Sequence, residues 1–263
     1  MTIISDTLLK RQSKCALVPF ITAGYPDLKS TIDALYILDK NGADIIELGI
    51  PYADALADGP IIQESSRIAL SQGVHIDQVI NMLNLVTPNL NAPIVLFTYY
   101  NPILAKGIEK FLSASAQSGV KGLIIPDLPL EETDYIIDLC NKYKIELILF
   151  VAPTSSTIRI NAIVSKSPGC IYLVSSNGVT GIRNKINIHI GTLAKEIKHK
   201  TQKAIILGFG ISNATQVAQI SKWSIDGLVI GSAFIKTMFN KEPDDAIKSL
   251  GNFCEEVRDA IDQ

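Results

Sequence analysis

Short apolar runs alternate with longer segments of helical period along the whole chain, and this alternation constrains its fold more than any other feature. Strands joined by helices of such length run parallel, because the chain must cross over a helix to return to the same end of the sheet. Eight strands are expected, at Ala16–Thr22, Asp44–Leu48, Ile94–Tyr99, Gly122–Ile125, Leu147–Val151, Ile171–Val174, Ala204–Leu207 and Gly227–Ile230.

The intervening segments predict eight helices, at Lys29–Lys40, Ile61–Ser71, Ile108–Ser118, Glu131–Tyr143, Ser156–Ser165, Gly191–Lys200, Ala214–Ser221 and Asp244–Ile261. Three further helices are expected: Ile4–Gln12 as a cover outside the first strand, Ile76–Leu85, and Phe234–Phe239 after the last strand. Eight units favour a closed barrel over an open sheet, and 263 residues is close to the length of about 250 typical of that fold. We therefore predict a single domain, residues 1–263, of the α/β class: a (β/α)8 TIM barrel with an additional N-terminal helix.

Charge and composition exclude several classes of partner. The chain has 24 basic and 26 acidic residues and no basic tract, which argues against binding nucleic acid. Its apolar runs are shorter than the roughly 18 to 20 residues of a membrane span, and its first residues are polar, so we expect no membrane association and no secretion. The expected location is cytoplasmic or the plastid stroma. The four cysteines and three histidines lack the spacing of disulfide or metal motifs, so no metal is expected.

Two carboxylates lie where a strand ends and a loop begins. Residues 43–49 read as a strand, with Glu47 near its C-terminal end and Asp58 in the following loop. A charged group in so apolar a strand is costly to bury unless it is paired or functional. Glu47 in a salt bridge inside the barrel, and Asp54 or Asp58 as ordinary turn residues, are the structural alternatives. Because barrels keep their active sites at the C-terminal strand ends, the pair is a candidate acid/base site.

Glycines after the last strands predict a phosphate site. Gly208 and Gly210 follow the seventh strand, and Gly231-Ser232 follows the eighth and opens the short final helix. Backbone N–H groups at such a helix start bind anions, and glycine allows close approach to the main chain. Gly181, after the sixth strand, is placed to add another N–H. We expect a phosphorylated small-molecule substrate and a phosphate-binding helix after the last strand.

Aromatic residues gather at the predicted strand ends. Such side chains suit a flat apolar ring in a pocket, although ordinary barrel packing is the alternative for each. The candidates are Phe20, Phe97, Tyr99 and Phe209.

Several motifs, in their order and spacing, closely resemble the tryptophan synthase α subunit over essentially the whole chain. They are Pro19-Phe-Ile-Thr-Ala-Gly-Tyr-Pro26, Glu47-Leu-Gly-Ile-Pro-Tyr-Ala-Asp-Ala-Leu-Ala-Asp-Gly-Pro60, Gly178-Val-Thr-Gly181, Gly208-Phe-Gly-Ile-Ser212 and Gly231-Ser-Ala233. The resemblance implies a lyase that splits indole-3-glycerol phosphate into indole and glyceraldehyde 3-phosphate by a retro-aldol-type reaction without a cofactor in this chain. It also implies a β subunit carrying pyridoxal phosphate, which receives the indole within an α2β2 assembly.

The resemblance assigns roles residue by residue. Glu47 matches the general acid/base, and Asp58 matches the carboxylate that accepts the indole N–H. Tyr172 matches an active-site tyrosine, and Thr180 matches the loop threonine that meets the second carboxylate. The loop from Pro51 to Asp54 is expected to contact the β subunit, and Pro51 and Asp54 are the residues expected to make that contact.

The chain departs from the family pattern in two loops. Ala53-Asp54-Ala55 stands where Ser-Asp-Pro is usual, and Ser176 and Asn177 stand where an arginine and a small residue are common. Replacing proline frees one φ angle, which adds about 0.4 to 1 kcal/mol of entropy to the open loop. The first change bears on coupling to the partner more than on the chemistry.

Three alternatives stay open at the level of sequence. A self-sufficient lyase would release free indole without a partner. A non-catalytic regulatory barrel would bind the phosphate ligand but leave it uncleaved. A different phosphosugar barrel, such as an isomerase, would have less need of aromatic strand ends.

Overall fold

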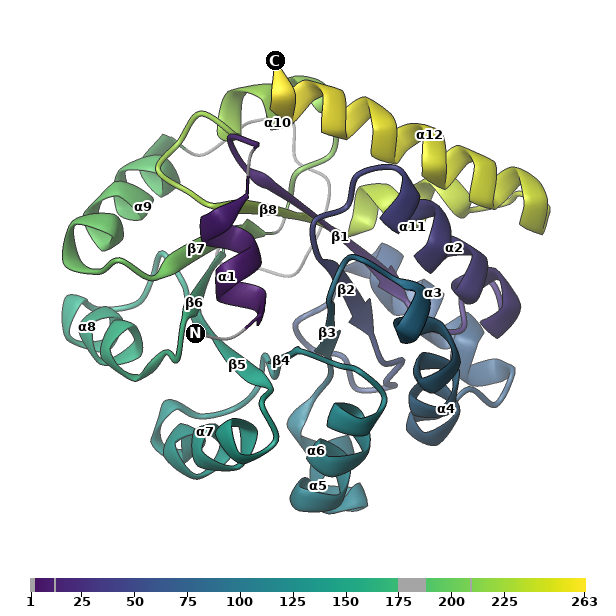
Figure 1. The fold of residues 1–263 in the computed structure, drawn as a ribbon, viewed down its shortest axis with the longest axis horizontal. Coiled ribbons are helices and arrows are strands. Elements are labelled where there is room, and N and C mark those ends of the chain that lie inside the picture. The colour runs from purple at the N-terminus through teal and green to yellow at the C-terminus, as the bar shows by residue number, and fades with distance from the viewer. Residues whose placement is uncertain (1–2, 12, 175–187, 209) are drawn as a thin grey trace.

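Eight parallel strands close into a barrel in the order β1 to β8, with β1 paired to β8. The computed structural model describes residues 3–11, 13–174, 188–208 and 210–263. Figure 1 shows the strands at the centre and most helices in a ring outside them. The predicted barrel is confirmed, and its strands are β1 (Ala16–Thr22), β2 (Ile46–Gly49), β3 (Ile94–Phe97), β4 (Gly122–Ile124), β5 (Glu146–Val151), β6 (Cys170–Val174), β7 (Ala204–Gly208) and β8 (Gly227–Ile230).

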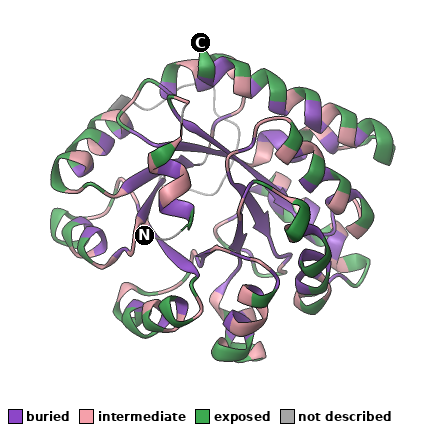
Figure 2. Cartoon of the chain, in the orientation of Figure 1, coloured by how far each residue is buried: buried purple, intermediate pink, exposed green. Residues whose placement is uncertain are grey.

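The helices bury one face against the strands and expose the other, as Figure 2 shows. In the described residues they are α1 (Ile3–Lys10), α2 (Leu28–Lys40), α3 (Pro60–Ser71), α4 (Ile76–Val86), α5 (Tyr100–Lys106), α6 (Ile108–Gln117), α7 (Thr133–Lys142), α8 (Thr157–Lys166), α9 (Ile188–Lys200), α10 (Ala214–Ile220), α11 (Ser232–Met238) and α12 (Pro243–Asp262). Two short 3₁₀ turns, η1 (Thr87–Asn89) and η2 (Leu130–Glu132), precede β3 and α7.

The predicted start of β2 differs from the structure. The strand begins at Ile46 rather than at Asp44. The Asp44 carboxylate accepts the N–H of Leu17 at 2.7 Å and pairs with Arg258 at 2.9 Å. Asp44 therefore ties α12 to the start of β1 instead of extending the strand.

Helix α5 was missed from the sequence, which reads as a loop over 99–102. Pro102 is compatible with the first turn of a helix, where its missing N–H has no partner to lose. The carboxylate of Asp127, from the loop after β4, accepts the N–H of Tyr100 at 2.8 Å and caps the helix. Gly107, with φ of +87°, ends it. The capping residue is distant in sequence, so no local pattern announces this helix.

Helix α1 lies against the strands rather than in the outer ring of helices (Figure 1). The backbone N–H and the hydroxyl of Ser5 donate to the two carboxylate oxygens of Glu146 at 3.0 and 2.6 Å. Glu146 opens β5 and is fully buried. Gly169 leaves room for this contact, because a Cβ there would collide with the Ser5 hydroxyl. The N-terminal end of the barrel is thus covered, as predicted for this helix, and the functional loops lie at the other end.

Candidate active site

Glu47 is the second residue of β2 and has 2 % of its surface exposed. Its neighbours in register are Phe20 of β1 and Val95 of β3, both apolar. The Oε2 atom is buried and has no hydrogen-bond partner among the described residues. Burial, together with the nearby charge of Asp58, raises the pKa of Glu47 to about 8. Glu47 is therefore protonated at neutral pH and can give up a proton.

Asp58 lies in the loop between β2 and α3 and is also buried. Its N–H donates to the carbonyl of Ala55 at 3.2 Å, and its own carbonyl accepts the side-chain amide of Gln63 at 2.9 Å. Burial raises the pKa of Asp58 to about 7, while the Tyr99 hydroxyl, acting as a donor, opposes that rise. Asp58 therefore ionises before Glu47.

The two carboxyl groups thus have different preferred protonation states in one site. The Tyr99 hydroxyl favours the charged form of Asp58, whereas burial and the charge of Asp58 both favour the protonated form of Glu47. Two titratable groups whose environments separate their pKa values are the pattern expected of an acid and an electrostatic partner. The salt-bridge alternative for Glu47 finds no support, because the described residues offer it no ion pair.

Three predicted aromatic residues form a continuous row beside Glu47. The ring centroids of Phe20 and Phe97 lie 5.8 Å apart, and those of Phe97 and Tyr99 lie 6.1 Å apart, both edge to face. Tyr52 extends the row, 5.3 Å from Tyr99. Gly49 makes room for the Phe20 ring, because a Cβ at this position would lie 2.5 Å from that ring. The row supplies an apolar wall at the C-terminal strand ends.

Tyr172 of β6 is fully buried, and its ring lies 4.7 Å from that of Phe150. Burial, followed by the charges of Glu47 and Asp58, raises the pKa of Tyr172 well above its ordinary value, so its hydroxyl stays neutral. Gly208 at the end of β7 lets that hydroxyl approach the backbone, because a Cβ there would collide with it. The charges of both carboxyl groups therefore reach Tyr172.

Phe150 was missed by the sequence reasoning. It is half-buried near the end of β5, in register with Tyr172. The available signal was an aromatic residue close to a strand end, the same signal that selected Phe97.

The predicted phosphate end is described in part. Gly231 follows β8, and Ser232 is the first residue of α11, with both residues half-exposed. Gly210 has φ of +82°, a backbone conformation that favours glycine. Thr180, Gly181 and Phe209 lie outside the described residues, as do Ser176 and Asn177.

The predicted partner contacts differ in exposure. Pro51 is buried, whereas Ala53 and Asp54 are exposed. Leu56, in the same loop, has 85 % of its surface exposed.

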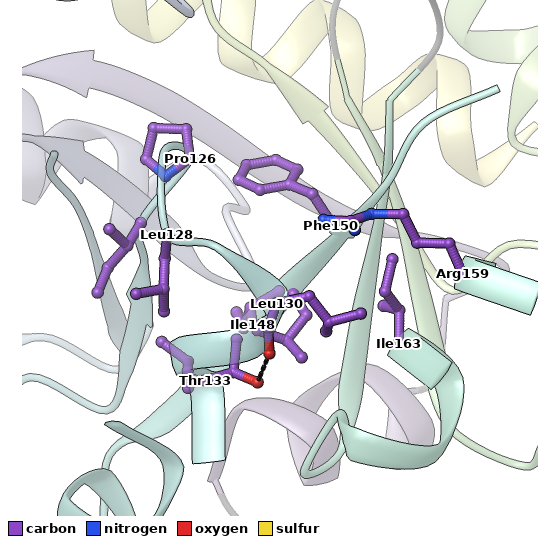
Figure 3. Close-up of a pocket in the computed structure, with 11 residues that line it drawn as sticks. Pro126, Leu128, Leu130, Thr133, Ile148, Phe150, Arg159 and Ile163 are labelled. Atoms are coloured by element: carbon purple, nitrogen blue, oxygen red, sulfur yellow. Dashed lines mark hydrogen bonds between the residues drawn. The ribbon is translucent and has the colours of Figure 1, made fainter. Parts of the chain in front are cut away.

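A separate cavity of about 120 Å³ lies beside β4, β5, α7 and α8. Figure 3 shows Leu128, Leu130 and Ile163 along its walls and the Thr133 hydroxyl bonded to the Leu130 carbonyl at 2.7 Å. Its lining includes neither Glu47 nor Asp58. Phe150 lines this cavity and also packs against Tyr172 of the carboxylate site.

Three further features of the described residues concern thiols, metal ligands and membrane spans. The four cysteines are buried thiols. Within 3–11, 13–174, 188–208 and 210–263, His, Cys, Asp and Glu side chains form no group of three suited to a metal ion. Over the same residues, no helix is both long enough and apolar enough to cross a membrane.

Comparisons with known proteins agree with this architecture. The family model "Tryptophan synthase alpha chain" matches residues 7–262. Two tryptophan synthase alpha chains, from Gracilaria tenuistipitata var. liui and Antithamnion sp., are 59 % and 57 % identical to this chain. Each alignment covers 99 % of this chain, and 97 % and 99 % of those proteins respectively.

Solved structures show the same fold. Tryptophan synthase subunit alpha from Legionella pneumophila str. Paris has a TM-score of 0.88 and 30 % identity, covering 100 % of this chain and 99 % of that one. A chain of the tryptophan synthase a2b2 complex from Pyrococcus furiosus has a TM-score of 0.87 and 34 % identity, covering 94 % and 98 %. The resemblance inferred from the motifs is confirmed. This chain belongs to the tryptophan synthase alpha chain family, the carbon–carbon lyases that cleave indole-3-glycerol phosphate in tryptophan biosynthesis.

Proposed function

We propose that Glu47 and Asp58 carry out the cleavage of indole-3-glycerol phosphate in this chain. One observation carries the proposal: two buried carboxyl groups, both with raised pKa values and with the charge of Asp58 acting on Glu47, lie beside an aromatic wall at the C-terminal end of the barrel. The alpha chains of this family use no cofactor, and pyridoxal phosphate belongs to the beta subunit. The chemistry therefore falls to side chains of the barrel.

Glu47 acts as the general acid and then as the base. Its protonated carboxyl gives a proton to C3 of the indole ring, which makes the ring cationic. The bond between C3 and the glycerol chain then breaks, its electron pair returns to the ring, and the hydroxyl at the adjacent carbon becomes an aldehyde. The proton released from that hydroxyl passes to the Glu47 carboxylate, so the residue is restored. Indole and glyceraldehyde 3-phosphate are the products.

Asp58 accepts the indole N–H and remains ionised. Its negative charge stabilises the ring cation that forms on protonation, and a buried charge does this better than a solvated one. The surroundings of the two groups support this division, because a hydroxyl donor favours the charged form of Asp58, while burial and the charge of Asp58 favour the protonated form of Glu47.

The remaining predicted residues surround the substrate in this proposal. Phe20, Phe97, Tyr99 and Tyr172 wall the indole ring, and their burial beside Glu47 supports that placement. Gly210, Gly231 and Ser232 bind the phosphate through backbone N–H groups and a hydroxyl. Thr180, Gly181 and Phe209 join them from loops outside the described residues. Residues 1–263 act as one TIM-barrel domain.

The homologous solved structures include tryptophan synthase a2b2 complexes. We infer that this chain likewise pairs with a beta subunit in an α2β2 assembly and passes indole to it, using the loop that contains Pro51 and Asp54. The exposure of Asp54 and Leu56 supports a contact there and favours this reading over a self-sufficient lyase. Relatives from red algae and cyanobacteria support a location in a plastid or in cytoplasm.

The test is the rate of indole formation from indole-3-glycerol phosphate, measured for the chain alone and with a tryptophan synthase beta subunit added. Glu47→Gln should lower kcat about 10²- to 10⁴-fold, because it removes general acid/base catalysis. Asp58→Asn should lower it about 10²- to 10³-fold, because it removes the stabilising charge.

Substantial turnover by both variants would refute the assignment. High activity of the parent chain without a partner would instead indicate a self-sufficient lyase. Ligand binding without cleavage, even with the beta subunit present, would indicate a regulatory barrel.

A further inference from the structure

Tyr99 is held in place more firmly than a pocket wall requires. It follows the end of β3, and 3 % of its surface is exposed. Its ring is packed between Tyr52 at 5.3 Å and Phe97 at 6.1 Å. Two aromatic neighbours fix the ring plane, and the hydroxyl position is fixed with it.

That hydroxyl reaches the loop that carries Asp58. The N–H of Ala57 donates to the Tyr99 hydroxyl oxygen at 3.0 Å, across 42 positions of sequence. Ala57 directly precedes Asp58, so the bond fixes the backbone at the catalytic carboxylate. Because the oxygen accepts from Ala57, its own proton is available to a second acceptor. The hydroxyl and the Asp58 carboxyl act on each other's ionisation: the hydroxyl lowers the pKa of Asp58 against the effect of burial, and Asp58 adds to the rise that burial gives the pKa of Tyr99.

We propose that Tyr99 is a positioning residue for Asp58: its hydroxyl ties the loop at Ala57 and holds the adjacent carboxylate charged and oriented toward the substrate ring. The inference deepens the proposed function and rests on it, because Asp58 must act as a carboxylate for its orientation to matter. The wall role assigned to Tyr99 uses only the ring, whereas this role uses only the hydroxyl.

Hydrogen bonds from neighbouring segments also hold the backbone near Tyr99 and Asp58. Asp127 caps α5 at Tyr100, the residue after Tyr99, so the end of β3 is anchored from a neighbouring loop. The side chain of Gln63 holds the Asp58 carbonyl at 2.9 Å from the α3 side. The loop backbone is thus held from two directions around Asp58.

The titratable groups coupled to this pair come from three parts of the fold. Glu47 lies on β2, Tyr172 on β6 and Asp127 in the loop after β4. Burial, followed by the charges of Asp58 and Asp127, raises the pKa of Tyr99. Tyr99 therefore keeps its proton and remains a donor. Its donation lowers the pKa of Asp58 against the effect of burial.

Tyr99→Phe is the informative variant, because it keeps the ring and removes only the hydroxyl. With the beta subunit present, kcat should fall about tenfold, the loss expected for a hydrogen bond to a charged group, while KM changes little. The acid limb of the kcat/KM profile should move to higher pH. The sign follows because loss of a donor to the carboxylate raises its pKa, and Asp58 works in its charged form.

Amide hydrogen exchange gives a readout that is independent of catalysis. In the parent chain the Ala57 N–H is bonded to Tyr99, so its exchange should be slow, and in Tyr99→Phe it should become faster. Tyr100→Phe is the matched control. Its hydroxyl acts on Glu132 rather than Asp58, so its pH profile and its Ala57 exchange should coincide with those of the parent.

An acid limb of Tyr99→Phe that superimposes on that of the parent overturns the proposal, whether or not Ala57 exchange changes. Asp58→Asn separates this failure from failure of the proposed function. If Asp58→Asn keeps full activity, the function assigned to Asp58 is wrong. If Asp58→Asn is inactive while Tyr99→Phe matches the parent profile, only the positioning role of Tyr99 is wrong.

Discussion

Burial raises the pKa of both Glu47 and Asp58, but the two residues differ in what surrounds them. Glu47 sits in a strand between apolar neighbours, and Asp58 sits in a loop near a hydroxyl donor. The donor favours the charged form of Asp58, whereas the charge of Asp58 disfavours that of Glu47. The separation of the two pKa values is therefore a property of the pair.

This separation predicts a narrow bell-shaped pH profile. Activity should rise with pH as Asp58 ionises near a pKa of about 7, and fall as Glu47 loses its proton near a pKa of about 8. The measurement is kcat/KM for indole formation across that range. Loss of the alkaline limb in the residual activity of Glu47→Gln would assign that limb to Glu47. An activity that keeps rising above the pKa of Glu47 would contradict its role as the acid.

The same residues explain what sequence reasoning reached and what it missed. Glu47, Asp58 and the row of Phe20, Phe97 and Tyr99 were chosen from their residue types at strand ends, and the structure brings them together. The bond from Ala57 to the Tyr99 hydroxyl was out of reach, because it depends on the path of a loop rather than on a pattern.

At the level of elements, prediction succeeded where the local sequence alone determines the structure of a segment. β1 and β8 have the predicted bounds to the residue, because continuous apolar runs end at clear breaks. The prediction missed α5 because its capping residue, Asp127, comes from another loop. The covering role of α1 was predicted, but its anchor was not, since Ser5 and Glu146 are 141 positions apart.

The anchor of α1 predicts a measurable loss of stability. Ser5→Ala removes the hydroxyl that donates to buried Glu146 at 2.6 Å and should lower the free energy of unfolding by about 1.5 to 3 kcal/mol, as expected for a hydrogen bond to a charged group. Urea unfolding is the measurement. Ser71→Ala is the control, because that exposed hydroxyl bonds only a carbonyl of its own helix, and its effect should stay within about 0.5 kcal/mol. Equal losses from the two variants would refute the anchoring role.

At the level of the whole molecule, the barrel divides its two ends between different tasks. Glu146 and α1 close one end, and the carboxylates and their loops occupy the other. The loop from β2 to α3 belongs both to the interior and to the outer surface, since Asp58 is buried while Leu56 is 85 % exposed.

The exposed position of Leu56 predicts a loss of partner binding without a loss of stability. Leu56→Ala should change the free energy of unfolding by less than about 0.5 kcal/mol, because little apolar surface is lost from the interior. If Leu56 lies at the centre of the contact, the Kd for the beta subunit should rise at least about fivefold, the effect of about 1 kcal/mol. Calorimetric titration measures it.

Leu85→Ala on α4 is the matched control. That leucine is 73 % exposed but lies outside the partner loop, so its variant should bind like the parent. Equal binding by both variants would remove Leu56 from the contact.

The long-range anchors of the N-terminal segment also set an order of assembly. During synthesis the N-terminal residues emerge first. Ser5 cannot meet its carboxylate until β5 has emerged, and β1 cannot complete its pairing until β8 has done so. The first strand of the barrel is therefore among the last to be secured, and β8 must leave the ribosome before the barrel can close.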